Sequence, residues 1–178
     1  MKLRHLFFAC SGVFVMMFSL LLLVVIVFSD EEDGGSGGNL IYGGVSVSQE
    51  VLAHKPMLEK YAREYGIEEY LNVLLAIIQV ESGGTLEDVM QSSESLGLPP
   101  NSLSTEESIK QGCKYFSELL AAAETKGCDL NSVIQSYNYG GGFLDYVAGR
   151  GKKYTFELAE SFAREKSSGK KVTYTNPV

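Results

Sequence analysis

One acidic residue ends the most apolar helical stretch of this 178-residue chain. In the segment LLAIIQVESGG, residues 74–84, the side chains of Leu74, Ile78 and Glu81 fall on the same face of a helix. A carboxyl group on an apolar face resists ionisation, because desolvation disfavours the charged form and raises the pKa. Such an acid can donate a proton near neutral pH, as general acid catalysis requires. The alternative is an ordinary carboxylate at a helix end, whose charged group reaches water.

Polar side chains follow this acid in two further segments. DVMQSSES, residues 88–95, supplies carboxylates, an amide and hydroxyls, and QSYNYGGGF, residues 135–143, places a tyrosine and an asparagine before three glycines. Asp88 follows Glu81 by seven residues across a glycine hinge, and it is our first candidate for a second carboxylate. Its alternative role is that of a solvated loop residue or a helix cap.

Helices must position these groups, since no part of the chain after residue 45 shows the long alternation typical of a strand. Ser104 and Glu107 have the spacing of a capping box, and Thr155 is suited to cap the last helix. Glycines and prolines separate the elements. We predict an all-α domain with helices over about residues 56–65, 68–82, 104–126, 129–139, 143–147 and 155–162, and with an irregular segment over residues 83–103.

The first 44 residues differ in composition from the rest. Residues 6–28 form an apolar run without charge, which is long enough to span a bilayer core of about 30 Å. Basic residues precede the run and acidic residues follow it, so we predict that residues 1–5 are cytoplasmic and that the chain then crosses the cell membrane once. An acidic, glycine-rich linker over residues 29–44 would lead to a single extracellular domain over residues 45–178. A cleaved signal peptide, and hence a secreted domain, is the alternative.

The composition argues against several classes of partner. The formal net charge is -7, and no basic cluster alternates with aromatic residues, so we expect no nucleic acid partner. We also expect no metal and no cofactor, because histidine, cysteine and aspartate do not occur at metal-ligand spacing. Cys113 and Cys128 could form a disulfide in an oxidising exterior, but two small buried thiols are the favoured interpretation.

The order of four short motifs resembles that of the lysozyme-like superfamily, which includes goose-type lysozymes and soluble lytic transglycosylases. The resemblance covers about residues 51–162 and is nearest to the lysozyme-like muramidase domain of cell-wall hydrolases found in bacterial conjugative elements. It implies a lysozyme-like helical domain with a catalytic groove for peptidoglycan glycan strands. The motifs are Glu81-Ser82, Met90-Gln91, Gly112 with Tyr115, and Tyr137-Asn138-Tyr139-Gly140.

The resemblance also implies roles for the polar residues. Glu81 would protonate the glycosidic oxygen, and some members use a further carboxylate, for which Asp88 is the catalytic candidate. Tyr137 would orient the acid, and Asn138 would bind the N-acetyl sugar. The alternative roles are structural: a polar loop bonded to its own backbone, a core tyrosine and an asparagine that ends a helix. The remaining predicted substrate-binding residues are Gln91, Ser92, Ser93, Glu94 and Tyr115.

Two departures from the transglycosylase pattern favour hydrolysis: the segment between Glu81 and Gln91 is short, and Tyr139 replaces a small residue. We predict a membrane-tethered N-acetylmuramidase that cleaves the bond between N-acetylmuramic acid and N-acetylglucosamine. The short tether predicts local remodelling of the wall, with an envelope-spanning secretion or conjugation machine as a candidate partner. The alternatives are a lytic transglycosylase that forms anhydromuramic products and a glycan-binding module without catalytic activity.

Overall fold

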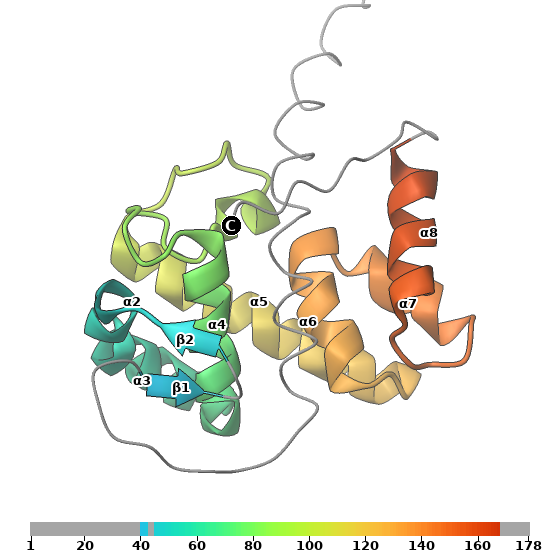
Figure 1. Ribbon diagram of the computed structural model, residues 1–178, viewed down its shortest axis with the longest axis horizontal. Coiled ribbons are helices and arrows are strands. Elements are labelled where there is room, and N and C mark those ends of the chain that lie inside the picture. Colours follow the sequence, from blue (N-terminus) through green and yellow to red (C-terminus); the bar gives the residue numbers. More distant parts are fainter. Residues whose placement is uncertain (1–39, 43–44, 168–178) are drawn as a thin grey trace, which may run out of the picture.

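Helices form almost all of the domain in the computed structural model, which describes residues 40–42 and 45–167 (Figure 1). This confirms the predicted helical class. A short 3-10 helix, η2 (Glu68–Tyr70), leads directly into α4, and a second, η3 (Ser92–Leu96), lies between α4 and α5. The α-helices are α2 (Gln49–Ala53), α3 (Lys55–Glu64), α4 (Leu71–Glu81), α5 (Thr105–Lys126), α6 (Leu130–Tyr139), α7 (Gly142–Ala148) and α8 (Phe156–Lys166).

A two-stranded antiparallel ribbon precedes these helices, and the sequence pattern does not predict it. Strand β1 (Leu40–Tyr42) pairs with β2 (Val45–Val47), and Leu40 lies opposite Val47. Three residues in a strand are too few for an alternating pattern to be recognised. β1 falls within the predicted linker, residues 29–44, while β2 contacts α4 and buries Val47 in the core.

Helix α4 is buried on all sides. The six consecutive residues from Val73 to Ile78 are buried, and α4 contacts α2, α3 and β2. The sequence predicted one apolar face, whereas residues 73–78 are apolar and buried on every face, as is typical of a helix inside a core. Because α4 ends at Glu81, the fold places this acid where the main core meets the surface.

Helix α5 connects the two halves of the domain, since it contacts α3 and η3 on one side and α6 and α7 on the other. The predicted capping box is present: the backbone N–H and the hydroxyl of Ser104 both donate to Glu107 Oε2, at 3.0 and 2.6 Å. Gly127 ends the helix in the left-handed conformation, with φ at 70°. These end signals were recognisable in the sequence because each depends on one residue type at a fixed offset.

A second, smaller core lies between α6, α7 and α8, away from the ribbon (Figure 1). Tyr139, Phe143 and Phe162 form its centre, with ring centroids 5.2 to 5.7 Å apart. Such ring pairs add about 0.5–1.5 kcal/mol each beyond their area burial. This cluster holds the end of α6 in place beside α7.

No helix among the described residues is long and apolar enough to cross a membrane. The predicted anchor, residues 6–28, lies outside the described residues. Cys113 and Cys128 are both free thiols, as the favoured interpretation expected, but only Cys113 is buried, and Cys128 is half-buried.

The turn after α4 packs tightly against α2. Gly84 has φ at +78°, and a Cβ added there would lie 2.7 Å from the carbonyl carbon of Glu50 and from the nitrogen of Val51. His54 Nε2 also lies 2.9 Å from the carbonyl oxygen of Gly84. Helix α2 and its flanking residues therefore fix the turn that follows Glu81.

We expect Gly84→Ala to lower the free energy of unfolding by about 2–4 kcal/mol. An alanine would have to adopt a disfavoured positive φ, and its methyl group would clash with the backbone of α2. The matched control is Gly66→Ala, where φ is +67° but no atom lies within 4 Å of the added Cβ. This control should lose only about 1–2 kcal/mol. Urea unfolding measures both losses, and equal losses would show that α2 does not constrain the turn.

Candidate active site

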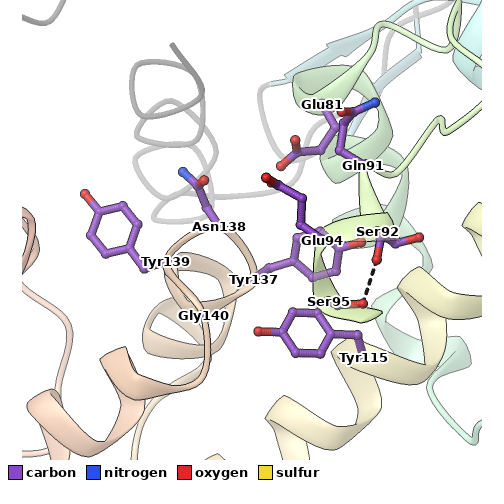
Figure 2. Close-up of a pocket in the computed structure, with 10 residues that line it drawn as sticks. All are labelled: Glu81, Gln91, Ser92, Glu94, Ser95, Tyr115, Tyr137, Asn138, Tyr139 and Gly140. Carbon is purple, nitrogen blue, oxygen red and sulfur yellow. Dashed lines mark hydrogen bonds between the residues drawn. The ribbon is translucent and has the colours of Figure 1, made fainter. Parts of the chain in front are cut away.

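A pocket opens at the end of α4 and brings together residues from four parts of the chain (Figure 2). The contributing parts are α4, the loop with η3, α5, and the end of α6. The pocket includes every predicted site residue except Asp88 and Ser93. Among the described residues, no group of three or more His, Cys, Asp or Glu side chains is placed to hold a metal ion. The lining residues are Glu81, Gln91, Ser92, Glu94, Ser95, Tyr115, Tyr137, Asn138, Tyr139 and Gly140.

Glu81 is half-buried, and part of its side chain faces the pocket. Burial first, and then the negative charges of Glu94 and Asp88, together raise the pKa of its carboxyl group to about 8. None of the lining residues, all within the described part of the chain, is a lysine, arginine or histidine that could offset these charges. The carboxyl group of Glu81 is therefore mostly protonated at neutral pH, as a proton donor must be.

Glu94 is the second carboxylate of the pocket. It lies on η3 with an exposed side chain, and Figure 2 shows its carboxyl group and that of Glu81 pointing into the same space. Its charge affects the pKa of Glu81 more than the charge of Asp88 does. The pocket thus combines a buried acid with an exposed carboxylate.

Asp88 lies behind the pocket wall and has no exposed surface. Its Oδ1 accepts hydrogen bonds from the backbone N–H of Ser92 at 3.0 Å and from the hydroxyl of Ser108 at 2.6 Å. Its Oδ2 accepts a hydrogen bond from the N–H of Ser93 at 3.2 Å. This geometry corresponds to the helix-cap alternative, since both N–H groups belong to the first turn of η3. Ser93 is likewise fully buried and away from the pocket.

The loop before η3 holds Gln91 in an uncommon conformation. Gln91 has φ at 47°, in the left-handed region, and its Nε2 donates to the carbonyl oxygen of Asp88 and to Oδ1 of Asn101, both at 2.8 Å. The side-chain amide is therefore oriented by the loop itself, beside Glu81 in Figure 2. On the other side of η3, Ser95 Oγ donates to the carbonyl oxygen of Ser92 at 2.6 Å.

Tyr137 forms the buried base of the pocket. Its hydroxyl donates to the carbonyl oxygen of Met90 at 3.1 Å, and its ring lies 5.5 Å from that of Tyr115. Burial raises the pKa of this hydroxyl well above its ordinary value, and the charge of Glu81 adds to the effect. Gly112 on α5 makes room for both partners, because an added Cβ would lie 2.5 Å from Met90 Sδ and 2.8 Å from Tyr137 Oη. Tyr137 thus joins α6 to the loop rather than bonding directly to the acid.

The end of α6 closes the far side of the pocket. Asn138 is half-buried and lines the pocket, and Figure 2 shows its side chain at the end of α6, across from Glu81 and Glu94. Gly140 follows with φ at 81° and ψ at 159°, a conformation that is essentially restricted to glycine. The helix therefore stops directly after the residues that reach the pocket.

The sequence interpretation missed two residues at or behind this site: Ser95 lines the pocket, and Ser108 bonds to Asp88 behind it. Tyr139 and Gly140 also line the pocket, and the sequence named them only as part of a motif. Ser108 carries a recognisable signal, since it lies on the buried face of α5 with Ile109 and is itself fully buried. A polar residue on an apolar face was the signal that identified Glu81, and it applies equally to Ser108. No comparable signal marks Ser95, which lies in an irregular segment.

Comparison with known proteins agrees with this geometry. The family model described as Lysozyme-like matches residues 48–178. The chain belongs to the lysozyme-like family. This confirms the resemblance that the four motifs indicated.

Three relatives illustrate the relationship. The bifunctional muramidase/DL-endopeptidase CwlT of Bacillus subtilis (strain 168) is 44% identical over 124 residues, which are 69% of this chain and 37% of that protein. The uncharacterized membrane protein YocA of the same strain is 37% identical over 130 residues, 72% of this chain and 58% of that protein. A crystal structure described as similar to lipoprotein, NLP/P60 family, from Staphylococcus aureus subsp. aureus Mu50 superposes with a TM-score of 0.74 at 73% identity. That match covers 76% of this chain and 46% of the other, so this chain spans about half of the length of such relatives.

The raised pKa of Glu81 makes stability depend on pH. Its ordinary pKa is 4.5 and its pKa in the folded domain is about 8, so the folded state binds more protons than the unfolded state between these values. Stability is therefore lost as the pH rises through this range. We expect Glu81→Gln, which is always neutral, to be more stable than the wild type at pH 9 by on the order of 5 kcal/mol, and to match it near pH 4. Urea unfolding at both pH values measures this, and a difference independent of pH would contradict the burial of the acid.

Proposed function

We propose that this domain is an N-acetylmuramidase that hydrolyses the bond between N-acetylmuramic acid and N-acetylglucosamine in peptidoglycan. The observation that carries the proposal is the carboxyl group of Glu81, which is protonated near neutral pH at the wall of a polar pocket. Membership of the lysozyme-like family supports it, as does a relative named as a muramidase. A second relative named as a membrane protein supports a location at the cell envelope.

In the proposed reaction, Glu81 donates its proton to the glycosidic oxygen as the bond to the anomeric carbon breaks. The positive charge that develops on the sugar ring faces the carboxylate of Glu94. Water adds its oxygen to the anomeric carbon, and the proton that this water releases passes to Glu94. The products are two shorter glycan strands, and proton exchange with solvent restores both carboxyl groups.

We assign the second carboxylate to Glu94 and not to Asp88, because only Glu94 reaches the pocket. The oxygens of Asp88 already accept three hydrogen bonds, and no part of this residue is exposed. A group that stabilises charge on a sugar must lie at the surface that the sugar contacts. Glu94 meets this condition as a lining residue of the pocket.

The remaining lining residues suit a neutral, hydroxyl-rich ligand. Asn138 presents an amide and Ser95 a hydroxyl, while Tyr115 adds an aromatic face. Such a mixture of amides, hydroxyls and an aromatic ring can bond sugar hydroxyls and pack against a pyranose face. We propose that Asn138 and Gln91 bind the N-acetyl group and the hydroxyls of the sugar next to the cleaved bond.

We expect Glu81→Gln and Glu94→Gln in the full-length chain each to lower kcat on purified peptidoglycan by about 10²- to 10⁴-fold, since each removes one proton-transfer group. Wild-type activity should fall as the pH rises through about 8, where Glu81 loses its proton. The matched control is Glu87→Gln, a neighbouring exposed acid outside the pocket, which should keep wild-type activity. Release of reducing ends measures the rate.

Mass spectrometry of the products separates the alternatives. Hydrolysis leaves reducing muramic acid ends, whereas anhydromuramic ends would show a transglycosylase reaction, in which a hydroxyl of the sugar replaces water. Wild-type protein that cleaves no faster than Glu81→Gln would contradict any enzymatic role.

A further inference from the structure

The residues behind the pocket form a connected set of hydrogen bonds between the loop and α5. Ser108 of α5 takes part in three of them: its hydroxyl donates to Asp88 Oδ1 at 2.6 Å and accepts from the N–H of Met90 at 3.0 Å, and its carbonyl oxygen accepts from the hydroxyl of Ser92 at 2.9 Å. Both side chains of the central pair, Asp88 and Ser108, have no exposed surface. The set is therefore closed to water.

Asp88 bridges this set to the start of η3. Its two oxygens accept the N–H groups of Ser92 and Ser93, which begin η3 and have no partner within that helix. Glu94 is the next residue along η3, and the hydroxyl of Ser95 bonds back to the carbonyl oxygen of Ser92. The start of η3, from which Glu94 extends to the pocket, is thus held by bonds that end on Asp88, and Gln111 of α5 donates a further bond to Ser95 Oγ at 2.9 Å.

We propose that Asp88 is a positioning residue: together with Ser108 it fixes the start of η3 and thereby holds Glu94 opposite Glu81. The inference rests on the proposed function and extends it to a pair of residues that the substrate does not contact. Asp88 acts through the loop and not on the sugar.

The expected effect on catalysis follows from the hydrogen bonds that Asp88 and Ser108 make. Asp88→Asn replaces one carboxylate oxygen by an NH₂ group, which is a donor. The N–H groups of Ser92 and Ser93 and the Ser108 hydroxyl then cannot all keep an acceptor, and the first turn of η3 must move to recover one. A displacement of a reacting group by about 1 Å can lower a rate by about 100-fold. A loss of activity on changing Asp88 would therefore arise even though this residue never reaches the pocket.

A variant of Ser108 distinguishes a positioning role of Asp88 from a direct catalytic role. A directly catalytic Asp88 would not need the Ser108 hydroxyl, whereas a positioning Asp88 would. The experiment compares Asp88→Asn, Ser108→Ala and the double variant in the full-length chain, with kcat and KM on purified peptidoglycan and with thermal unfolding. The matched control is Ser117→Ala, because Ser117 lies on the same helix and its hydroxyl donates to the carbonyl oxygen of Lys114, within that helix and away from Asp88.

We expect Asp88→Asn to lower kcat by about 100-fold and Ser108→Ala by about 10-fold or more, while KM changes less. The double variant should be about as active as Asp88→Asn alone, because both changes break the same set of bonds. Ser117→Ala should match the wild type. If Asp88→Asn does not unfold cooperatively, the activity of folded Ser108→Ala decides the question by itself.

Two results would overturn the inference. One is Ser108→Ala with wild-type kcat beside a folded but inactive Asp88→Asn, which would show that Asp88 acts directly on the substrate. The other is Asp88→Asn with wild-type kcat. Failure of the proposed function looks different, since the wild type would then be no more active than Glu81→Gln, and the positioning role would fail with it.

Discussion

The site depends on one constraint, the burial of a carboxyl group at the end of a helix that is itself buried on all sides. Helix α4 has little freedom to move, because the core surrounds it from Val73 to Ile78. The turn after it is held by α2 through the close approach at Gly84. Glu81 therefore stays in a poorly solvated position at the end of α4, and this burial is the main cause of its raised pKa.

The rest of the pocket is assembled around this fixed acid by shorter and less regular elements. The loop with η3 brings Glu94, and the end of α6 brings Asn138. The loop with η3 has no long helix of its own, so buried polar bonds hold it in place. Asp88 ties the loop to α5, and Tyr137 ties α6 to the same loop through the carbonyl oxygen of Met90. A satisfied buried network of this kind specifies one arrangement, since any shift leaves polar groups without partners.

Local signals in the sequence were enough to predict the acid and the α-helices from α3 to α8, but not the short helices α2 and η3. Capping residues and glycines fixed the ends of α5, and the helical period placed Glu81 on the apolar face. Local signals could not predict which carboxylate is the partner of this acid, because Asp88 and Glu94 lie in a segment without periodicity. Which of the two faces the pocket depends on contacts with Ser108, distant in the chain, and on the left-handed turn at Gln91. Sequence spacing favoured Asp88, while burial and hydrogen bonding favour Glu94.

The most direct test of the account is a titration of the Glu81 carboxyl group itself by carbon-detected NMR, with Glu81→Gln used to assign the signal. We predict a pKa near 8 in the wild type. In Glu94→Gln the pKa should be lower, because a neighbouring negative charge has been removed. A pKa near the ordinary value of 4.5 in the wild type would contradict the account, since Glu81 would then be ionised at neutral pH and unable to donate a proton.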